Sequence, residues 1–239
     1  MKKSLPALAL LSLCAFSLPP SSASATPKMD VKIAVGVGST TLVPRVPTID
    51  LYSGGPDNPV YEGTVGGRNA QTYPNWGMQI GARVTAGKIF GEIAMGFSRF
   101  YFAVGDQLEL IAEIEGNPLP PEILGSQARM NQLEIPLTAG YVPYANPYFK
   151  LFLYAGWIST FNLRGFVDFN GNRKALKFKP KDIPGFPLAI YVSGLRVGTQ
   201  FDLGPLNFDF SYTIGMNSIT ATDFRTNSHV FKMFLGWLF

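Results

Sequence analysis

Large apolar side chains alternate with small or polar ones along seven segments of the chain, and an eighth segment is apolar on both faces. In the last nine residues, 231–239, every second residue is apolar, and the other register holds Lys232 and Gly236. Such alternation predicts a β-strand with one apolar face. Because the segment ends on an aromatic residue, we expect this strand to face lipid and to close a sheet. Its apolar positions are Phe231, Met233, Leu235, Trp237 and Phe239.

Seven further segments are predicted strands. They span residues 30–38, 76–86, 89–102, 132–141, 148–160, 188–202 and 206–214. The segment 148–160 is apolar on both faces, so its register stays open. In the others, one face is aromatic, aliphatic or β-branched and the opposite face carries Gly, Ser, Thr and charged residues. The first kind of face suits lipid, and the second suits a narrow interior.

Long connections rich in Gly, Pro, Asn and Ser alternate with short turns. The predicted long loops are 44–75, 104–127, 162–187 and 217–227. This pattern predicts an all-β fold, an eight-stranded antiparallel up-and-down transmembrane β-barrel with its long loops outward and both termini on the periplasmic side. A soluble ligand-binding barrel also alternates in this way. Its apolar residues would point inward, and it would stay in solution without detergent.

Residues 1–25 have the features of a cleavable secretory signal peptide. Lys2 and Lys3 precede an apolar stretch, 5–18, and small residues at 23–25 offer a cleavage site. The apolar stretch is shorter than the roughly 20 residues of a membrane helix. Cleavage would leave the barrel domain, 26–239, without the single cysteine, so we expect no disulfide or thiol chemistry. Two of the 20 basic residues would also be lost, leaving 18 against 16 acidic ones, so we expect no nucleic-acid partner.

Charged residues in the polar register are expected to face the barrel interior. An eight-stranded barrel is just wide enough for side chains to fill, and a lone buried charge is costly. Mixed signs on different strands therefore predict a salt-bridged plug. A gated path for ions or solutes is the alternative. The residues of this predicted lumen network are Lys32, Arg83, Glu92, Glu134, Arg196, Asp209 and Lys232.

Two of the predicted outer loops carry opposite charge. The acidic loop has no basic residue, and its acids are Asp106, Glu109, Glu113, Glu115 and Glu122. The basic loop, within 162–187, contains two acids and the bases Arg164, Arg173, Lys174, Lys177, Lys179 and Lys181. Such charges are usually solvated, and exposed ion pairs contribute only about 0–1 kcal/mol. Alternatively, the segment 177–181 binds lipopolysaccharide phosphates or a protein partner.

No catalytic set, metal site or cofactor site is predicted. Ser228 and His229 are neighbours, but adjacent residues on a strand point to opposite faces and cannot share a proton. One histidine and no mature cysteine leave only carboxylates for a metal, and the remaining ligands of a calcium loop are absent from the sequence. We therefore expect neither enzyme activity nor a cofactor.

Two stretches resemble a known family. The segment Leu133-Glu134-Ile135-Pro136-Leu137 before a turn, and the segment 198–208 followed by the terminal aromatic strand, resemble the porin-like outer-membrane β-barrel proteins common in Bacteroidetes. That family includes the PorT component of the type IX secretion system. The resemblance covers nearly all of the mature chain. It implies an eight-stranded barrel in the outer membrane of a Gram-negative bacterium and supplies no catalytic residue.

The sequence therefore favours an integral outer-membrane β-barrel with a structural or loop-mediated interaction role. Two rival functions remain, a small porin-like channel for ions or solutes and a PorT-like accessory of a type IX secretion system. The expected partners are outer-membrane lipid and lipopolysaccharide, the barrel assembly machinery through the C-terminal strand, and a protein bound at the outer loops.

Overall fold

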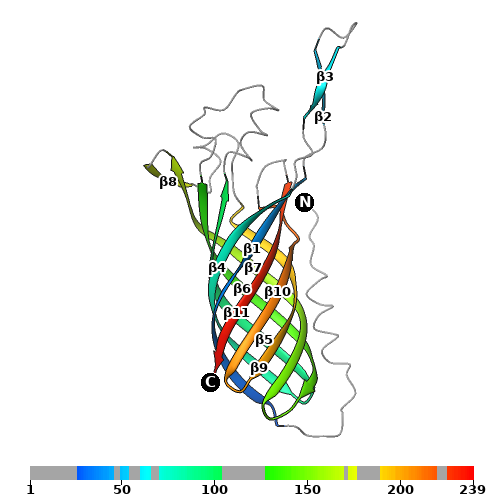
Figure 1. Ribbon diagram of the computed structural model, residues 1–239, viewed down its shortest axis with the longest axis vertical. Helices are drawn as coiled ribbons and strands as arrows, with labels where there is room; N and C mark the ends of the chain where they lie inside the picture. Colours follow the sequence, from blue (N-terminus) through cyan, green and yellow to red (C-terminus); the bar gives the residue numbers. More distant parts are fainter. Residues whose placement is uncertain are drawn as a thin grey trace, which may run out of the picture.

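The computed structural model describes residues 26–45, 49–53, 60–65, 70–103, 127–169, 172–176, 189–219 and 225–239. Eleven strands lie in these ranges (Figure 1). Eight of them form the barrel: β1 (Lys28–Arg45), β4 (Gln71–Ala86), β5 (Ile89–Ala103), β6 (Gln127–Ala145), β7 (Phe149–Phe169), β9 (Tyr191–Leu203), β10 (Leu206–Gly215) and β11 (Arg225–Leu238). The other three are β2 (Ile49–Ser53), β3 (Val60–Val65) and β8 (Asn172–Leu176).

The barrel is closed and antiparallel throughout. The strand order is β6-β5-β4-β1-β11-β10-β9-β7, and β6 also pairs with β7. The first and last strands are neighbours, with Lys32 opposite Leu238 and Arg45 opposite Arg225. Closure leaves no exposed strand edge in the wall. The predicted eight-stranded antiparallel barrel is confirmed.

The two ends of the barrel differ. At the short-turn end, tight turns join β4 to β5, β6 to β7 and β9 to β10, and the C-terminus lies there too (Figure 1). Two of these turns contain a glycine with positive φ, 61° at Gly87 and 60° at Gly204, a conformation that residues with a Cβ rarely adopt. The connections from β1 to β4, β5 to β6, β7 to β9 and β10 to β11 leave the opposite end, which we call the long-loop end.

Several strands extend into segments predicted as loops. The hairpin β2–β3 and the first residues of β4 lie within 44–75, and the end of β7 and all of β8 lie within 162–187. Backbone hydrogen bonding continues there beyond the apolar alternation from which strand ends were predicted. β1 also continues through Pro44, the first residue of the predicted loop 44–75, and pairs there with β11. Pairing with β4 stops at Leu42, so Pro44 lies at an edge on that side, where a missing N–H is tolerated.

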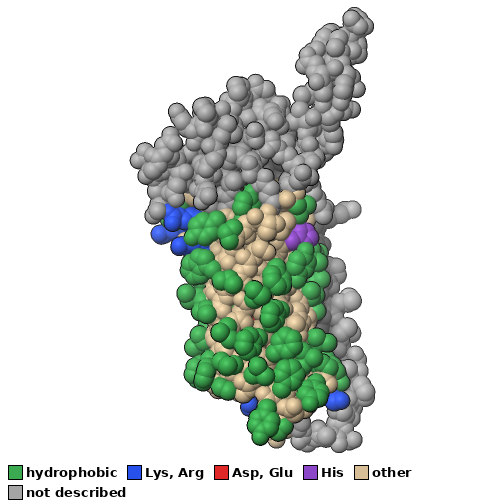
Figure 2. Space-filling model, in the orientation of Figure 1, with side chains coloured by type: hydrophobic (Ala, Val, Ile, Leu, Met, Phe, Trp, Pro, Cys, Tyr) green, Lys and Arg blue, Asp and Glu red, His purple; other side chains and the backbone are tan. Residues whose placement is uncertain are grey.

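The apolar register points outward. Val35, Met78, Ile93 and Leu137 are between 51% and 62% exposed, and apolar side chains cover the visible wall (Figure 2). On β7, whose register the sequence left open, Leu153 and neighbouring odd-numbered residues face out. This exterior is that of a barrel that spans a membrane, and it excludes the soluble ligand-binding barrel. Within the described ranges, no helix is long and apolar enough to cross a membrane.

Candidate functional site in the barrel interior

The structure places all seven residues of the predicted lumen network inside the barrel. Their exposed fractions run from 1% at Lys32, Arg83 and Asp209 to 8% at Glu134. Each occupies the strand register opposite to the lipid-facing residues, because successive side chains of a strand alternate between the two faces. They form two groups, a large one around Arg83 and a smaller one around Glu134.

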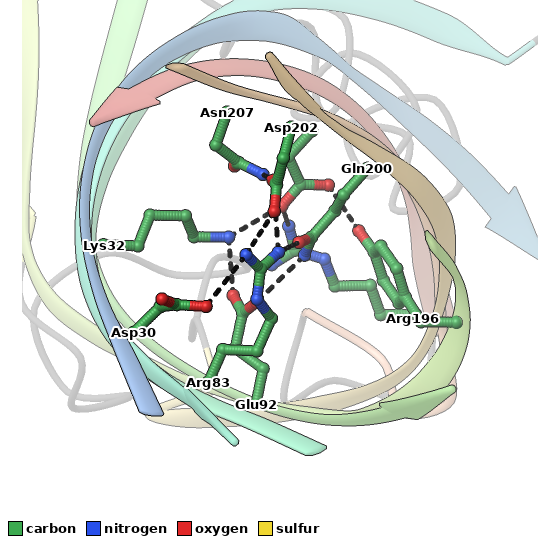
Figure 3. A network of polar contacts seen from close by, with 10 residues as sticks. Asp30, Lys32, Arg83, Glu92, Arg196, Gln200, Asp202 and Asn207 are labelled. Atoms are coloured by element: carbon green, nitrogen blue, oxygen red, sulfur yellow. Dashed lines mark hydrogen bonds and ion pairs between the residues drawn. The ribbon is translucent and has the colours of Figure 1, made fainter. Parts of the chain in front are cut away.

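Arg83 on β4 is the centre of the first group, which we call the Arg83 cluster. Its Nη2 lies 2.5 Å from Asp202 Oδ2 and 3.6 Å from Asp30 Oδ2. Its Nη1 donates a hydrogen bond of 3.1 Å to Gln200 Oε1. The two carboxylates come from β9 and β1, so this guanidinium joins three strands across the interior (Figure 3).

Lys32 extends the Arg83 cluster towards β10. Its Nζ lies 2.6 Å from Glu92 Oε1 and 3.5 Å from Asp209 Oδ2. Gln200 Nε2 donates to Glu92 Oε2 at 3.0 Å, which links this part to Arg83. Arg196 Nη2 lies 3.2 Å from the same Asp209 oxygen as Lys32. Charges from five strands are therefore connected in one network.

Aromatic rings fill the space beside the charged groups. The Tyr154 hydroxyl donates a 2.6 Å hydrogen bond to Asp209 Oδ1. The Tyr154 ring fits because Gly198 is its neighbour on β9; a Cβ there would lie 2.5 Å from the ring. The Arg83 guanidinium lies 4.1 Å from the centre of the Phe152 ring, which meets Phe90 edge to face at 5.0 Å. Cation–π contact of this kind stabilises a desolvated guanidinium.

The second group is a buried ion pair between β6 and β11. Lys232 Nζ lies 2.5 Å from Glu134 Oε1, and the Ser98 hydroxyl donates to the same oxygen at 2.6 Å. A small cavity of about 40 Å³ adjoins this pair and is also lined by Arg196 and by Ser and Thr side chains. This volume is roughly enough for a few waters. A second cavity, of about 260 Å³, lies at the short-turn end and is lined by Asp30 and Asp202 of the Arg83 cluster.

Sequence reasoning missed five members of the interior network. Asp202 and Gln200 continue the register of Arg196, so the alternation on β9 could have identified them. Asp30 likewise continues the register of Lys32, and Tyr154 was missed because the register of β7 was open. Asn207, whose Nδ2 donates to Asp202 Oδ1 at 2.7 Å, follows a tight turn where the alternation is just beginning.

The buried charges nearly balance. Among the described side chains, four buried cations (Lys32, Arg83, Arg196 and Lys232) face five buried carboxylates (Asp30, Glu92, Glu134, Asp202 and Asp209). The largely exposed Lys28 lies 2.9 Å from Asp30 and supplies a fifth cation at the short-turn end. Since a buried ion is costly unless it is paired and hydrogen-bonded, this balance is what makes a charged interior compatible with folding.

The predicted loop sites are only partly described. Arg164 is an exposed residue of β7, and Arg173 and Lys174 lie on β8, opposite Asp168 and Val167 of β7. The bases at 177, 179 and 181 and all five acids of the predicted acidic loop lie outside the described residues. On the C-terminal strand, all five predicted apolar residues (Phe231, Met233, Leu235, Trp237 and Phe239) are outward and 40–70% exposed.

Ser228 and His229 lie on opposite faces of β11. Ser228 lines the interior cavity, and His229 Nδ1 is 2.9 Å from the hydroxyl of Tyr212, a lipid-facing residue. They cannot act together as nucleophile and base. In the part of the chain that the structure describes, no three His, Cys, Asp or Glu residues are grouped so that they could hold a metal ion.

Solved structures with a similar fold exist, but the sequence matches no known protein family. No protein-family model and no curated protein matches the sequence. The attachment invasion locus protein Ail of Yersinia pestis is 9% identical over 89% of this chain and 99% of its own, with a TM-score of 0.42. Neisserial surface protein A is 13% identical over 89% of this chain and 99% of its own, with a TM-score of 0.44. LpxR from Salmonella typhimurium is 10% identical over 88% of this chain and 100% of its own, with a TM-score of 0.29. All three TM-scores are below 0.5, so the architecture rests on the strand pairing of this chain itself.

Proposed function

We propose that the chain is an outer-membrane β-barrel of a Gram-negative bacterium that acts through its long-loop end and does not conduct. The observation that carries this proposal is the interior network. Arg83, Lys32, Gln200, Asn207 and Asp209 are each less than 2% exposed, so almost none of their surface is accessible to water. A barrel filled in this way supports a structural or interaction role, with the connections at the long-loop end as its working surface.

A small porin-like channel is the rival that the network argues against. A conducting lumen needs side chains that contact water, as in wider barrels with an aqueous channel. Here the cations and carboxylates contact one another at 2.5–3.6 Å across the interior. Opening a path would require several of these ion pairs to separate, and each separation leaves buried charges without a partner.

The mature barrel, 26–239, is expected to be silent in a planar bilayer. The measurement is single-channel conductance of refolded protein, after a gel has shown that its mobility changes on heating, as a folded barrel's does. The Arg83→Gln and Glu134→Gln variants are the probes of the lumen. A steady conductance of the wild-type barrel that falls in either variant would instead establish the lumen as a path and support the transport function.

Orientation in the cell is a separate prediction. Long loops of outer-membrane barrels face outward and short turns face the periplasm. A cysteine at Phe178, in the predicted basic loop, should react with a membrane-impermeant maleimide on intact cells. A cysteine at Tyr148, which is 82% exposed at the short-turn end, should react only after lysis. The reverse pattern, or recovery of the protein in the soluble fraction, would contradict the proposed placement.

Two more specific roles are suggested by the sequence and not by the interior network, namely recognition by the barrel assembly machinery and a part in type IX secretion. The outward apolar register of β11 supports recognition by the barrel assembly machinery. A PorT-like role in type IX secretion rests on the resemblance alone, and it requires a stable complex with secretion components and a secretion defect on deletion. Of the two, we propose only the first as part of the function of this chain.

A further inference from the structure

Three arginines point away from the barrel on one part of its wall, at the long-loop end. Arg99 lies on β5, Arg129 on β6 and Arg164 on β7. We call them the arginine cluster. Basic side chains are visible where the apolar surface of the wall ends (Figure 2). These outward-facing cations play no part in the interior network.

The strand register brings the three residues together. Arg99 pairs with Asn131, and Asn131 pairs with Arg164, so two arginines flank one asparagine in a row across three strands. Arg129 lies two residues along β6 from Asn131, on the same face. With neighbouring strands about 4.8 Å apart and same-face residues roughly 6.6 Å apart along a strand, the three Cα atoms lie within about 10 Å of one another.

Aromatic rings and an asparagine hold two of the three arginines in place. Arg99 Nε donates to Asn131 Oδ1 at 2.7 Å, and its guanidinium lies 5.5 Å from the ring centre of Trp76. The Arg129 guanidinium lies 5.8 Å from the ring centre of Phe166. Cation–π contacts and the hydrogen bond restrict these long side chains before any ligand binds.

An apolar row lies directly below the cluster on the same three strands. Phe97 on β5 pairs with Leu133 on β6, which pairs with Phe161 on β7. Fixed cations immediately above a lipid-facing apolar row mark the depth at which membrane headgroups begin. The row of paired residues through Arg99 continues onto Trp76, Val37, Met233 and Phe210 of β4, β1, β11 and β10, which are all apolar, so the cations of this row lie on β5 and β7.

The positive charges of Arg99 and Arg164 are available to an anion. Neither Arg99 nor Arg164 contacts a carboxylate within the described ranges, and Arg164 is exposed. The guanidinium group presents paired N–H donors that match the oxygens of a phosphate and is the preferred group for binding one.

We propose that Arg99 and Arg164 of the arginine cluster bind a phosphate of a lipid A-type glycolipid in the outer leaflet, with the acyl chains lying on the apolar row below. This inference rests on the proposed function, because it requires the long-loop end to face the outer leaflet. A phosphorylated lipid satisfies both halves of the surface at once, since its phosphate pairs with the guanidinium groups and its chains cover the apolar side chains.

The test compares lipid A binding by wild-type barrel and two charge-matched variants. The purified, refolded barrel in zwitterionic detergent is titrated with lipid A, and bound lipid is counted by native mass spectrometry. The variant of the site is Arg99→Gln with Arg164→Gln. The matched control is Lys88→Gln with Lys150→Gln, which removes the same charge at the short-turn end. Arg164→Gln alone is a further probe, because Arg164 is exposed and its loss leaves the Arg99 contacts intact.

Wild-type barrel and the control should bind one lipid A with similar affinity, and the site variant should bind about tenfold or more weakly. Arg164→Gln should fall between them, and dephosphorylated lipid A should bind all forms equally and weakly. Equal affinity of the site variant and the control would overturn the proposal. Competition by millimolar inorganic phosphate as strong as that by lipid A would also overturn it, because the site would then take free phosphate rather than a lipid.

Failure of this proposal is distinguishable from failure of the proposed function. The binding measurement uses purified barrel whose folding is checked by its heat-dependent gel mobility, and it does not depend on orientation in a cell. The cysteine labelling described above tests orientation without any lipid ligand. If the barrel is correctly oriented and non-conducting but does not bind lipid A, the proposed lipid site is wrong and the proposed function still stands.

Discussion

Replacing Arg83 by methionine is expected to lower the free energy of unfolding by about 3–5 kcal/mol, the cost of removing one partner from a buried ion pair. Methionine keeps much of the side-chain length, so the loss reports on charge more than on volume. The substitution leaves Asp202 without its guanidinium and leaves Asp30 with Lys28, which is largely exposed, as its cationic partner. Urea titration of the barrel refolded in lipid vesicles, followed by tryptophan fluorescence and by gel mobility, measures this change.

A second substitution separates the charge effect from simple loss of packing. Asp202→Asn in the Arg83→Met background removes the stranded carboxylate and should recover part of the lost stability, since replacing a whole buried pair costs less than breaking it. Lys28→Gln, which removes a largely exposed partner of Asp30, should change stability by less than about 1 kcal/mol. An Arg83→Met barrel as stable as wild type would mean that water enters the cluster and that the lumen is not sealed.

The alternation of side chains was sufficient to predict the wall of the barrel. The alternation correctly predicts that Val35, Met78 and Leu235 face outward and that Lys32 and Arg83 face inward. This works because every strand of a closed sheet in lipid has one face towards the lipid and the other towards the interior. Strand ends were predicted less well. Above the lipid-facing band a strand no longer needs apolar residues on its outer face, so pairing continues without a pattern that the sequence displays.

The contacts inside and above the barrel could not be predicted in the same way. The alternation within a strand indicates that a residue faces inward. It does not give the residue's level along the barrel axis relative to residues on distant strands, so the sequence could not predict that Glu134 and Lys232 form a pair apart from the Arg83 cluster. The arginine cluster was hidden for another reason. The pairing of β6 with β7 shifts between Asn131 and Gln132, which skips Leu163. Asn162 therefore faces inward and Arg164 outward, although simple alternation would put both on one face.

Replacing Val35 by arginine tests the membrane-facing side of the wall. Val35 is 62% exposed and lies in the outward row Phe208–Leu235–Val35–Met78–Phe97. This row begins beside the short turn at Gly204 and rises towards the long-loop end, so Val35 is near the middle of the wall. Arginine on the lipid face at the bilayer midplane costs about 2–4 kcal/mol. We expect the barrel refolded in vesicles to lose about that much stability on urea titration.

The same substitution at the end of the wall gives the control. Tyr148→Arg places the guanidinium at the short-turn end, where the side chain reaches headgroups and water, and should cost only about 0–1 kcal/mol. The two variants should differ in stability because the cost of a charge depends on its depth in a bilayer. A wall surrounded by water would show no such dependence. If the outer face were solvated, an added charge at Val35 would be neutral or would improve solubility. Equal stability of Val35→Arg and Tyr148→Arg would therefore contradict a membrane-spanning wall, whatever the interior network does.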